Sequence, residues 1–141
     1  IQNLTKEIEY ITSNKDGDIF KILAKYGQTN IDNTDILDLN EVDGLISSIQ
    51  RSKIYIKSDH AKYNYNNQNS QFYSNVEIKY DDKIITCDNL DLQITKNYAI
   101  AYNNVKIKDN KSLLKAQMVK LDIITKDIII NSKNKVEIGS N

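Results

Sequence analysis

The stretch Asn14-Lys15-Asp16-Gly17-Asp18 has residue types that could bind a metal ion. It matches the middle of a calcium-binding loop, where oxygen ligands flank a glycine. Such a loop would place its first ligand at Thr12 and its bidentate glutamate at Leu23, and neither residue can serve. We therefore interpret the stretch as a hairpin turn, which Asp and Gly favour.

The other residues whose side chains could bind a metal or act in catalysis are His60 and Cys87, the single histidine and the single cysteine. One of each cannot build an ordinary zinc site, and one cysteine excludes an internal disulfide. A Cys/His nucleophile pair is one interpretation. Packing is the other, and we favour it because unrelated residues occupy the equivalent repeat positions. The carboxylates do not lie among apolar positions that would raise a pKa. The sequence therefore predicts no catalytic site, no metal and no cofactor.

Charge is balanced overall but not along the chain. The formal net charge of zero argues against a general nucleic-acid binder. Residues 1–50 hold four Lys and nine Asp plus Glu, whereas residues 51–141 hold fifteen Lys plus Arg and ten acids. This asymmetry indicates either a solvated face or a docking surface for a basic partner. The acids in question include Asp32, Asp35, Asp38, Glu41 and Asp43.

Two short phrases recur in step along the 141 residues. The first advances by 34, 29 and 29 positions, and the valines that mark the second advance by 34, 29 and 31. A repeat of this length indicates a stack of about four similar units that share one core, so we expect one domain over residues 1–141. The first phrase is Ile22-Leu23-Ala24, Ile56-Lys57-Ser58, Ile85-Thr86-Cys87 and Leu114-Lys115-Ala116, and the second centres on Val42, Val76, Val105 and Val136.

Within each unit, apolar and polar residues alternate with a period of two, which is typical of β-strands. The alternation slips by one residue at Asp59-His60 before Ala61, Tyr63 and Tyr65 continue the apolar face. A slip at the same place in every unit indicates a bulge that bends the strand. Turns rich in Asn and Asp separate the strands, for example at Ser132-Lys133-Asn134. The first unit is less regular, as a terminal cap would be, and Thr5–Ile11 could form a short helix.

The apolar face continues through every unit and forms the candidate site. Two interpretations remain open: a close-packed closed interior, or an open lining that accepts a long hydrophobic ligand. Small residues at Ser58, Ala61, Cys87 and Ala116 would leave room for such a ligand. The predicted lining residues are Leu39, Val42, Ile56, Ala61, Tyr63, Phe72, Val76, Ile78, Ile85, Leu90, Leu92, Ile100, Val105, Ile107, Leu114, Val119, Leu121 and Ile123.

The chain resembles the periplasmic domain of the LptC family, within the wider LptA/OstA-like group. The resemblance begins with Ile1-Gln2-Asn3-Leu4, Ile8-Glu9-Tyr10 and the run from Ile19 to Gly27. It continues with Ile56-Lys57-Ser58-Asp59-His60-Ala61-Lys62-Tyr63 and Asn75-Val76-Glu77-Ile78. It implies an all-β fold: a twisted antiparallel β-jellyroll of about four repeat units, open on one side.

The resemblance also implies a function. The protein would receive lipopolysaccharide from the inner-membrane ABC transporter complex and pass it to an LptA-like periplasmic protein, joined by edge-strand addition. It would lie in the periplasm, anchored by an inner-membrane helix upstream of this chain. The alternatives are an LptA-type bridge protein, a structural β-repeat module with a closed interior, and a carbohydrate-active β-solenoid enzyme. The last requires a cluster of carboxylates on one outer face, which the sequence does not supply.

Overall fold

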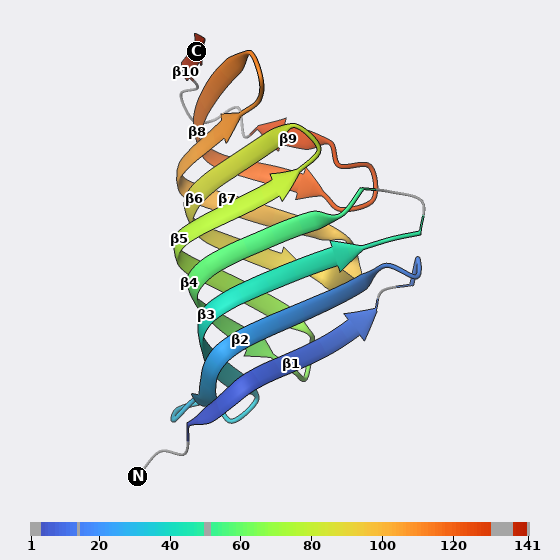
Figure 1. The fold of residues 1–141 in the computed structure, drawn as a ribbon, viewed down its shortest axis with the longest axis vertical. Coiled ribbons are helices and arrows are strands. Elements are labelled where there is room, and N and C mark those ends of the chain that lie inside the picture. Colours follow the sequence, from blue (N-terminus) through green and yellow to red (C-terminus); the bar gives the residue numbers. More distant parts are fainter. Residues whose placement is uncertain (1–3, 14, 50–51, 131–136, 141) are drawn as a thin grey trace.

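A computed structural model describes residues 4–13, 15–49, 52–130 and 137–140 of the chain. These residues form one ten-stranded sheet (Figure 1). One turn of 3₁₀ helix, η1 (Ile94–Lys96), lies between two of the strands. The strands are β1 (Thr5–Ser13), β2 (Ile19–Thr29), β3 (Ile36–Ser47), β4 (Ile54–Asn64), β5 (Asn69–Tyr80), β6 (Lys83–Gln93), β7 (Tyr98–Lys108), β8 (Ser112–Asp122), β9 (Ile128–Ile130) and β10 (Glu137–Ser140).

The sheet is an antiparallel meander in which β1 to β8 pair in chain order. The last long strand, β8, pairs with β10 through its first half and with β9 through its second half. Among the described residues, the edge strands at the two ends of the sheet do not pair with each other, so the sheet is open. This confirms the predicted all-β, antiparallel, jellyroll-like fold.

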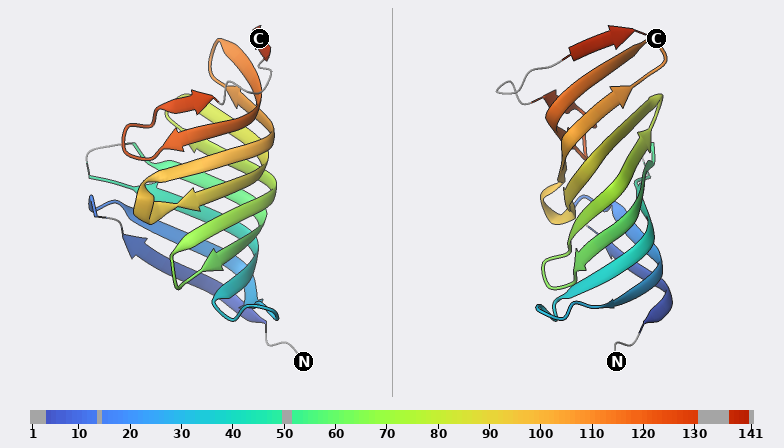
Figure 2. Two further views of the ribbon diagram at one scale, coloured as in Figure 1. Left: turned by 180° about the vertical axis from the view of Figure 1, so that it is seen from behind. Right: turned by 90° about the vertical axis from the view of Figure 1, so that its left-hand side faces the viewer.

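Each long strand bends near its middle, so the single sheet folds back on itself into two layers (Figures 1 and 2). We call the layer closer to the viewer in Figure 1 the near layer and the other the far layer. The bend runs along one side of the molecule, and we call the opposite side, where hairpin turns of both layers meet, the seam. The near layer contains residues 8–13, 19–24, 42–47, 54–58, 76–80, 83–87, 105–108 and 112–116, and the far layer contains 26–29, 36–40, 60–64, 69–73, 89–93, 98–102 and 118–122.

Bulges produce the bend. Pairing shifts register between Lys57 and His60, where β5 carries one extra residue, and it shifts again in β7. The extra residues belong to the pairs Ser74-Asn75 and Asn103-Asn104, whose φ angles are all positive. Asn adopts this left-handed conformation more readily than most residues, which explains its recurrence before the valines. The predicted slip at Asp59-His60 is therefore confirmed.

The two repeated phrases meet along the inside of the bend. The strand pairings place the marker residues in one row, where each small side chain of an even-numbered strand lies beside a valine of an odd-numbered strand. Small residues are needed because the two layers converge at a fold. The row is Ala24, Val42, Ser58, Val76, Cys87, Val105 and Ala116. Val136, the last marker, lies outside the described residues.

The core between the layers is built around two aromatic rings. Phe20 and Phe72 meet edge to face with centroids 6.5 Å apart. Gly44 lies beside both rings, and a Cβ there would come within 3.3 Å of the Phe20 ring and of Ile56. The missing side chain thus gives the phenylalanines their space.

Two local expectations are wrong. Thr5–Ile11 is part of strand β1, not a helix, because pairing with β2 satisfies its backbone. Tyr65 is 48% exposed, because β4 ends at Asn64. Its hydroxyl donates to the carbonyl of Thr34 in the turn between β2 and β3. The predicted turn at Ser132-Lys133-Asn134 lies outside the described residues.

Candidate lipid-binding interior

The structure brings the predicted lining residues together between the two layers. All but two of them are buried members of one hydrophobic cluster, with exposed fractions of 0–8%. Leu114 is partly buried and packs against this cluster. Ile100 is the exception. The buried members are Leu39, Val42, Ile56, Ala61, Tyr63, Phe72, Val76, Ile78, Ile85, Leu90, Leu92, Val105, Ile107, Val119, Leu121 and Ile123.

Ile100 lies on the outer face of the far layer, so its expected place in the lining is wrong. Its neighbours Ala99 and Ala101 are 2% and 4% exposed and point inward. Ile100 is paired with Asp91 and Lys120 on the outside. Simple alternation back from the buried Val105 and Ile107 places Ala101 and Ala99 inward, so the sequence pattern contained the signal for an outward Ile100.

Several interior residues were not among the predicted lining. Phe20 is fully buried, and Ile22, Ile54 and Ile94 are at most 1% exposed. The alternation in β2 and β4 contained the signal for the first three. Ile94 continues the alternation of Leu90 and Leu92, although it belongs to the 3₁₀ turn after β6 and not to a strand.

Side chains of the protein fill the interior. The small residues that could have left room for a ligand are closely covered: Ser58, Ala61, Cys87 and Ala116 are 0–6% exposed. Three of them lie in the bend row, where the layers converge. The hydroxyl of Ser58 donates to the carbonyl of His60 at 2.9 Å, within the bulge itself. With the layers closed, as they are in the structure, the three small residues of the bend row therefore allow the strands to bend and do not leave room for a ligand.

Turns of the two layers close the seam. The side-chain amide of Asn97, after η1, donates to the carboxylate of Asp16 in the β1–β2 turn at 2.9 Å. The ammonium of Lys126, after β8, donates to the backbone carbonyl of Ser52 before β4. A void of about 10 Å³ lies beside Ile54 and its neighbours, about the volume needed for a single ordered water.

Three buried hydroxyl groups lie next to this seam without a hydrogen-bond partner. They belong to Thr12, Ser70 and Tyr80. The strand pairings put Thr12 beside Phe20 in the near layer, and Ser70 beside Leu92 in the far layer. Burial and the nearby carboxylates of Asp81, Asp82 and Asp127 raise the pKa of Tyr80. Each buried hydroxyl without a partner costs about 1–3 kcal/mol in the closed state.

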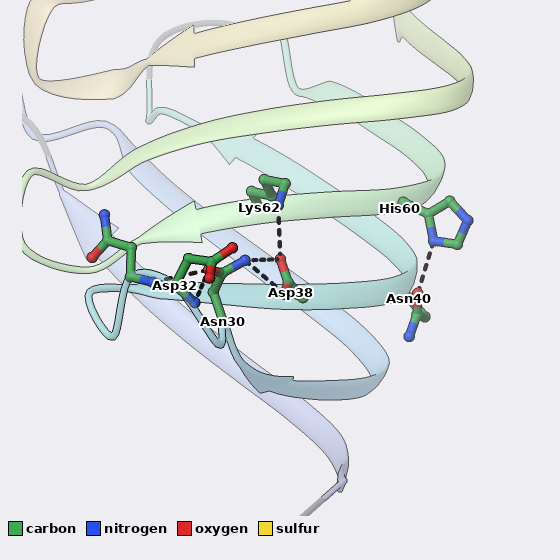
Figure 3. Close-up of polar contacts among 7 residues, drawn as sticks. Asn30, Asp32, Asp38, Asn40, His60 and Lys62 are labelled. Carbon is green, nitrogen blue, oxygen red and sulfur yellow. Dashed lines mark hydrogen bonds and ion pairs between the residues drawn. The ribbon is translucent and has the colours of Figure 1, made fainter. Parts of the chain in front are cut away.

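His60 and Cys87 lie on opposite faces of the sheet. The ring of His60 is on the outside, where its Nδ1 is 2.7 Å from the side-chain oxygen of Asn40 (Figure 3), and it packs against Tyr73. Cys87 lies in the buried bend row, and burial raises the pKa of its thiol to about 12. This placement favours the packing interpretation of both residues.

The acidic residues of the first unit do not form one surface. Asp38 lies on the outer face of the far layer, where it accepts hydrogen bonds from Asn30 and from Lys62 at 3.1 Å (Figure 3). Glu41 is at the bend, 3.8 Å from Lys25, and has a positive φ. Asp43 points outward from the near layer, paired in register with Lys57. Within the described residues, the acidic and Cys/His side chains form no cluster able to hold a metal ion.

The fold and interior define a class: an open-ended antiparallel β-jellyroll with a continuous apolar inner face. The family description "Lipopolysaccharide-assembly, LptC-related" matches residues 3–138. The chain therefore belongs to the LptC family, whose role is in lipopolysaccharide transport. A comparison with curated proteins gives no match. In the described part of the chain, no helix has the length and apolar character to cross a bilayer.

Proposed function

We propose that this domain binds the acyl chains of lipopolysaccharide between its two layers during transport. The observation that carries the proposal is the unbroken apolar inner face, which runs from β1 to β8 in a sheet whose edge strands, within the described residues, are β1 at one end and β9 and β10 at the other. Acyl chains would gain about 25 cal/mol for each Å² of apolar surface hidden from water. The sugars would remain outside in the aqueous phase. The predicted lining residues, without Ile100, would contact the lipid.

Entry requires the layers to separate at the seam while the bend acts as the hinge. The contacts that join the layers there include Asn97 with Asp16 and Lys126 with Ser52, all on turns. Opening would let the hydroxyls of Ser70 and Tyr80 find partners in water or on the lipid, which offsets part of the cost. Acyl chains would then cover the apolar surface that opening exposes. Exchange of protein contacts for lipid contacts keeps binding weak enough for release.

The two ends of the sheet would serve as joints to partner proteins. Unpaired strand edges can add a strand from another chain. We place the inner-membrane ABC transporter complex at the first unit and an LptA-like periplasmic protein at the last, around 113–138. The edge strand of the first unit is β1, whereas the expected contact region Phe20–Leu39 lies in β2 and β3, which are paired on both sides. A periplasmic location with an inner-membrane anchor follows from this arrangement.

Site-specific photocrosslinking tests the proposal in cells that make lipopolysaccharide. A photoreactive residue replaces Leu92, which is fully buried inside, and in a matched variant it replaces Ile100, which faces outward from the next strand. We expect a lipid adduct at position 92 and none at 100. A second outward control is Lys120, which is paired with Ile100 on the far layer.

Absence of an adduct at position 92 in a folded variant would instead support a structural module with a closed interior. The tight packing, with interior residues at most 8% exposed, favours that second candidate. An LptA-type bridge protein would give the same adduct. It differs in its neighbours, so crosslinking from an exposed edge residue such as Lys6 to proteins of the inner membrane separates the two.

A further inference from the structure

One row of residues on the outer face of the near layer contains apolar residues and lysines and no carboxylate. The strand pairings align one residue from each of eight consecutive strands. At the usual spacing between strands, the row is about 34 Å long. We call it the lysine–apolar row: Ile11, Lys21, Leu45, Tyr55, Lys79, Ile84, Lys108 and Leu113.

Three of the five apolar members of this row are unusually open to solvent for residues of a sheet, whereas Leu45 and Leu113 are half-buried. Ile11 is 59% exposed, Tyr55 is 52% and Ile84 is 39%. A shallow hollow of about 470 Å³ lies on this face, lined by Lys21, Tyr55 and neighbouring residues of β2 to β5. The outer face of the far layer differs, because its tyrosines are half-buried and its lysines, which include Lys62 and Lys120, are interspersed with Asn, Asp and Gln.

The neighbouring row contains acidic and basic residues in equal number among its described side chains, so its carboxylates do not neutralise the lysines of the lysine–apolar row. Its acidic members in the described side chains are Glu9, Asp43 and Glu77, and its basic members are Lys57, Lys106 and Lys115. Register places Lys106 directly opposite Lys115, a like-charge pair that costs stability. Glu137 pairs with Lys115 on its other side.

One lysine of the lysine–apolar row has an ion pair. Lys79 lies 3.1 Å from Glu77, but both side chains are well exposed, so the pair is weak. Together the two rows carry six lysines and three described carboxylates. Among the described side chains, these two rows therefore carry an excess of positive charge, although the whole chain has no net charge and Asp81 and Asp82 lie in the β5–β6 turn beyond them.

We propose that this face lies on the surface of an anionic lipid bilayer. Lysines with long apolar stems and ammonium tips bind lipid phosphates, while apolar and aromatic neighbours enter the interfacial region. The face combines both elements in one line, and a bilayer makes no demand for a deep pocket. An acidic protein would satisfy the lysines but would not require the exposed Ile11, Tyr55 and Ile84. This proposal is independent of lipid binding between the layers.

Co-sedimentation of the 141-residue chain with vesicles tests it. We expect binding to vesicles of phosphatidylethanolamine and phosphatidylglycerol, weakening as salt rises, and at least about tenfold weaker binding to phosphatidylcholine. Lys79→Glu with Lys108→Glu should lower binding to the anionic vesicles about tenfold. The matched control, Lys96→Glu with Lys120→Glu, makes the same charge change away from this face and should bind as the wild type does. Equal loss in both pairs, or no binding by the wild type, overturns the proposal.

The apolar half of the proposal has its own variant. Tyr55→Ser with Ile84→Ser leaves every charge in place and removes exposed side chains, so circular dichroism should show an unchanged fold. We expect weaker binding to the anionic vesicles and a smaller residual binding at high salt. Unchanged binding overturns the proposal, as does a concentration-dependent dimer, seen by light scattering without vesicles, that this variant abolishes.

Discussion

Asn97 and Asp16 lie 81 positions apart in the chain, yet the amide of the first donates to the carboxylate of the second at 2.9 Å. One residue follows the 3₁₀ turn of the far layer, and the other lies in the β1–β2 turn of the near layer. The contact therefore spans the seam, at the side opposite the bend. Because the bend is continuous backbone and the seam is not, the seam is where the two layers can part.

A chemical clamp across the seam should block lipid entry. Asp16→Cys and Asn97→Cys, joined by a short bis-maleimide in a Cys87→Ala background, would hold the layers together. We expect the clamped protein to lose the lipopolysaccharide adduct at position 92, and the same protein without the linker to keep it.

A control linkage within one layer distinguishes the effect of holding the seam closed from the effect of the chemical modification itself. Asn89→Cys and Asn103→Cys lie on one layer, where the native side chains are 3.1 Å apart, so linking them does not join the layers. This protein should keep its adduct at position 92. Loss of the adduct in both clamped proteins, or in neither, contradicts entry through the seam.

Phe72→Ala should strongly destabilise the fold. The ring is 1% exposed, meets Phe20 edge to face and contacts the space left by Gly44, so no neighbour can easily fill its volume. We expect a loss of about 3–5 kcal/mol in the free energy of unfolding, measured by urea denaturation. Tyr73→Ala, its outward-facing neighbour, should cost clearly less. Equal losses would mean that the interior is not the main source of stability.

The fold was predictable from the sequence because its repeat has a direct structural cause. Each marker, such as Ala24 or Val42, sits where a strand passes through the bend, and the bend demands a small residue on one strand and a valine on the next. The period-two pattern then assigned inside and outside correctly wherever the slip was recognised. The prediction for Ile100 was wrong although the same alternation, counted back from Val105, places Ala101 and Ala99 inward.

The seam could not be predicted from the sequence. Asn97 and Asp16 occupy turns whose composition indicates only that a turn is present. Their contact depends on how far the sheet folds over, which is set by all the bulges together. The unpartnered hydroxyls of Thr12 and Ser70 could not be predicted either, because a single hydroxyl in an alternating strand carries no signal for burial.

Asn104→Val should show that the bend depends on left-handed residues. Asn104 has a φ of 55°, and its amide donates to Asp88 at 2.7 Å. A β-branched residue is poorly suited to that conformation and cannot make the bond, so we expect a loss of about 1–2 kcal/mol in unfolding free energy. Asn104→Gly loses the bond but tolerates the φ angle, and should cost less. The reverse order of the two variants would contradict a conformational origin of the effect.

Cys87 should be inert in the folded protein. Its side chain is 5% exposed, and burial raises the pKa of the thiol to about 12, so almost no thiolate forms at pH 8. We expect reaction with a disulfide reagent to be at least about a hundredfold slower than in urea. Rapid reaction of the native protein would show that the bend row is open to solvent.

Asp91→Asn should stabilise the protein at neutral pH. Burial raises the pKa of Asp91 above its ordinary value of 3.8, although the hydrogen bond from the hydroxyl of Tyr102, at 3.3 Å, opposes this shift. The outward Ile100 pairs with Asp91 and contributes to its burial. Because the folded chain holds this proton more tightly, the stability from Asp91 is fully present below pH 3.8 and is lost as pH rises through the folded pKa. Asn keeps an acceptor for Tyr102 without the charge, so its melting temperature should exceed that of the wild type at pH 7, with the gap closing toward pH 3. A gap that stays constant with pH would assign the effect to packing.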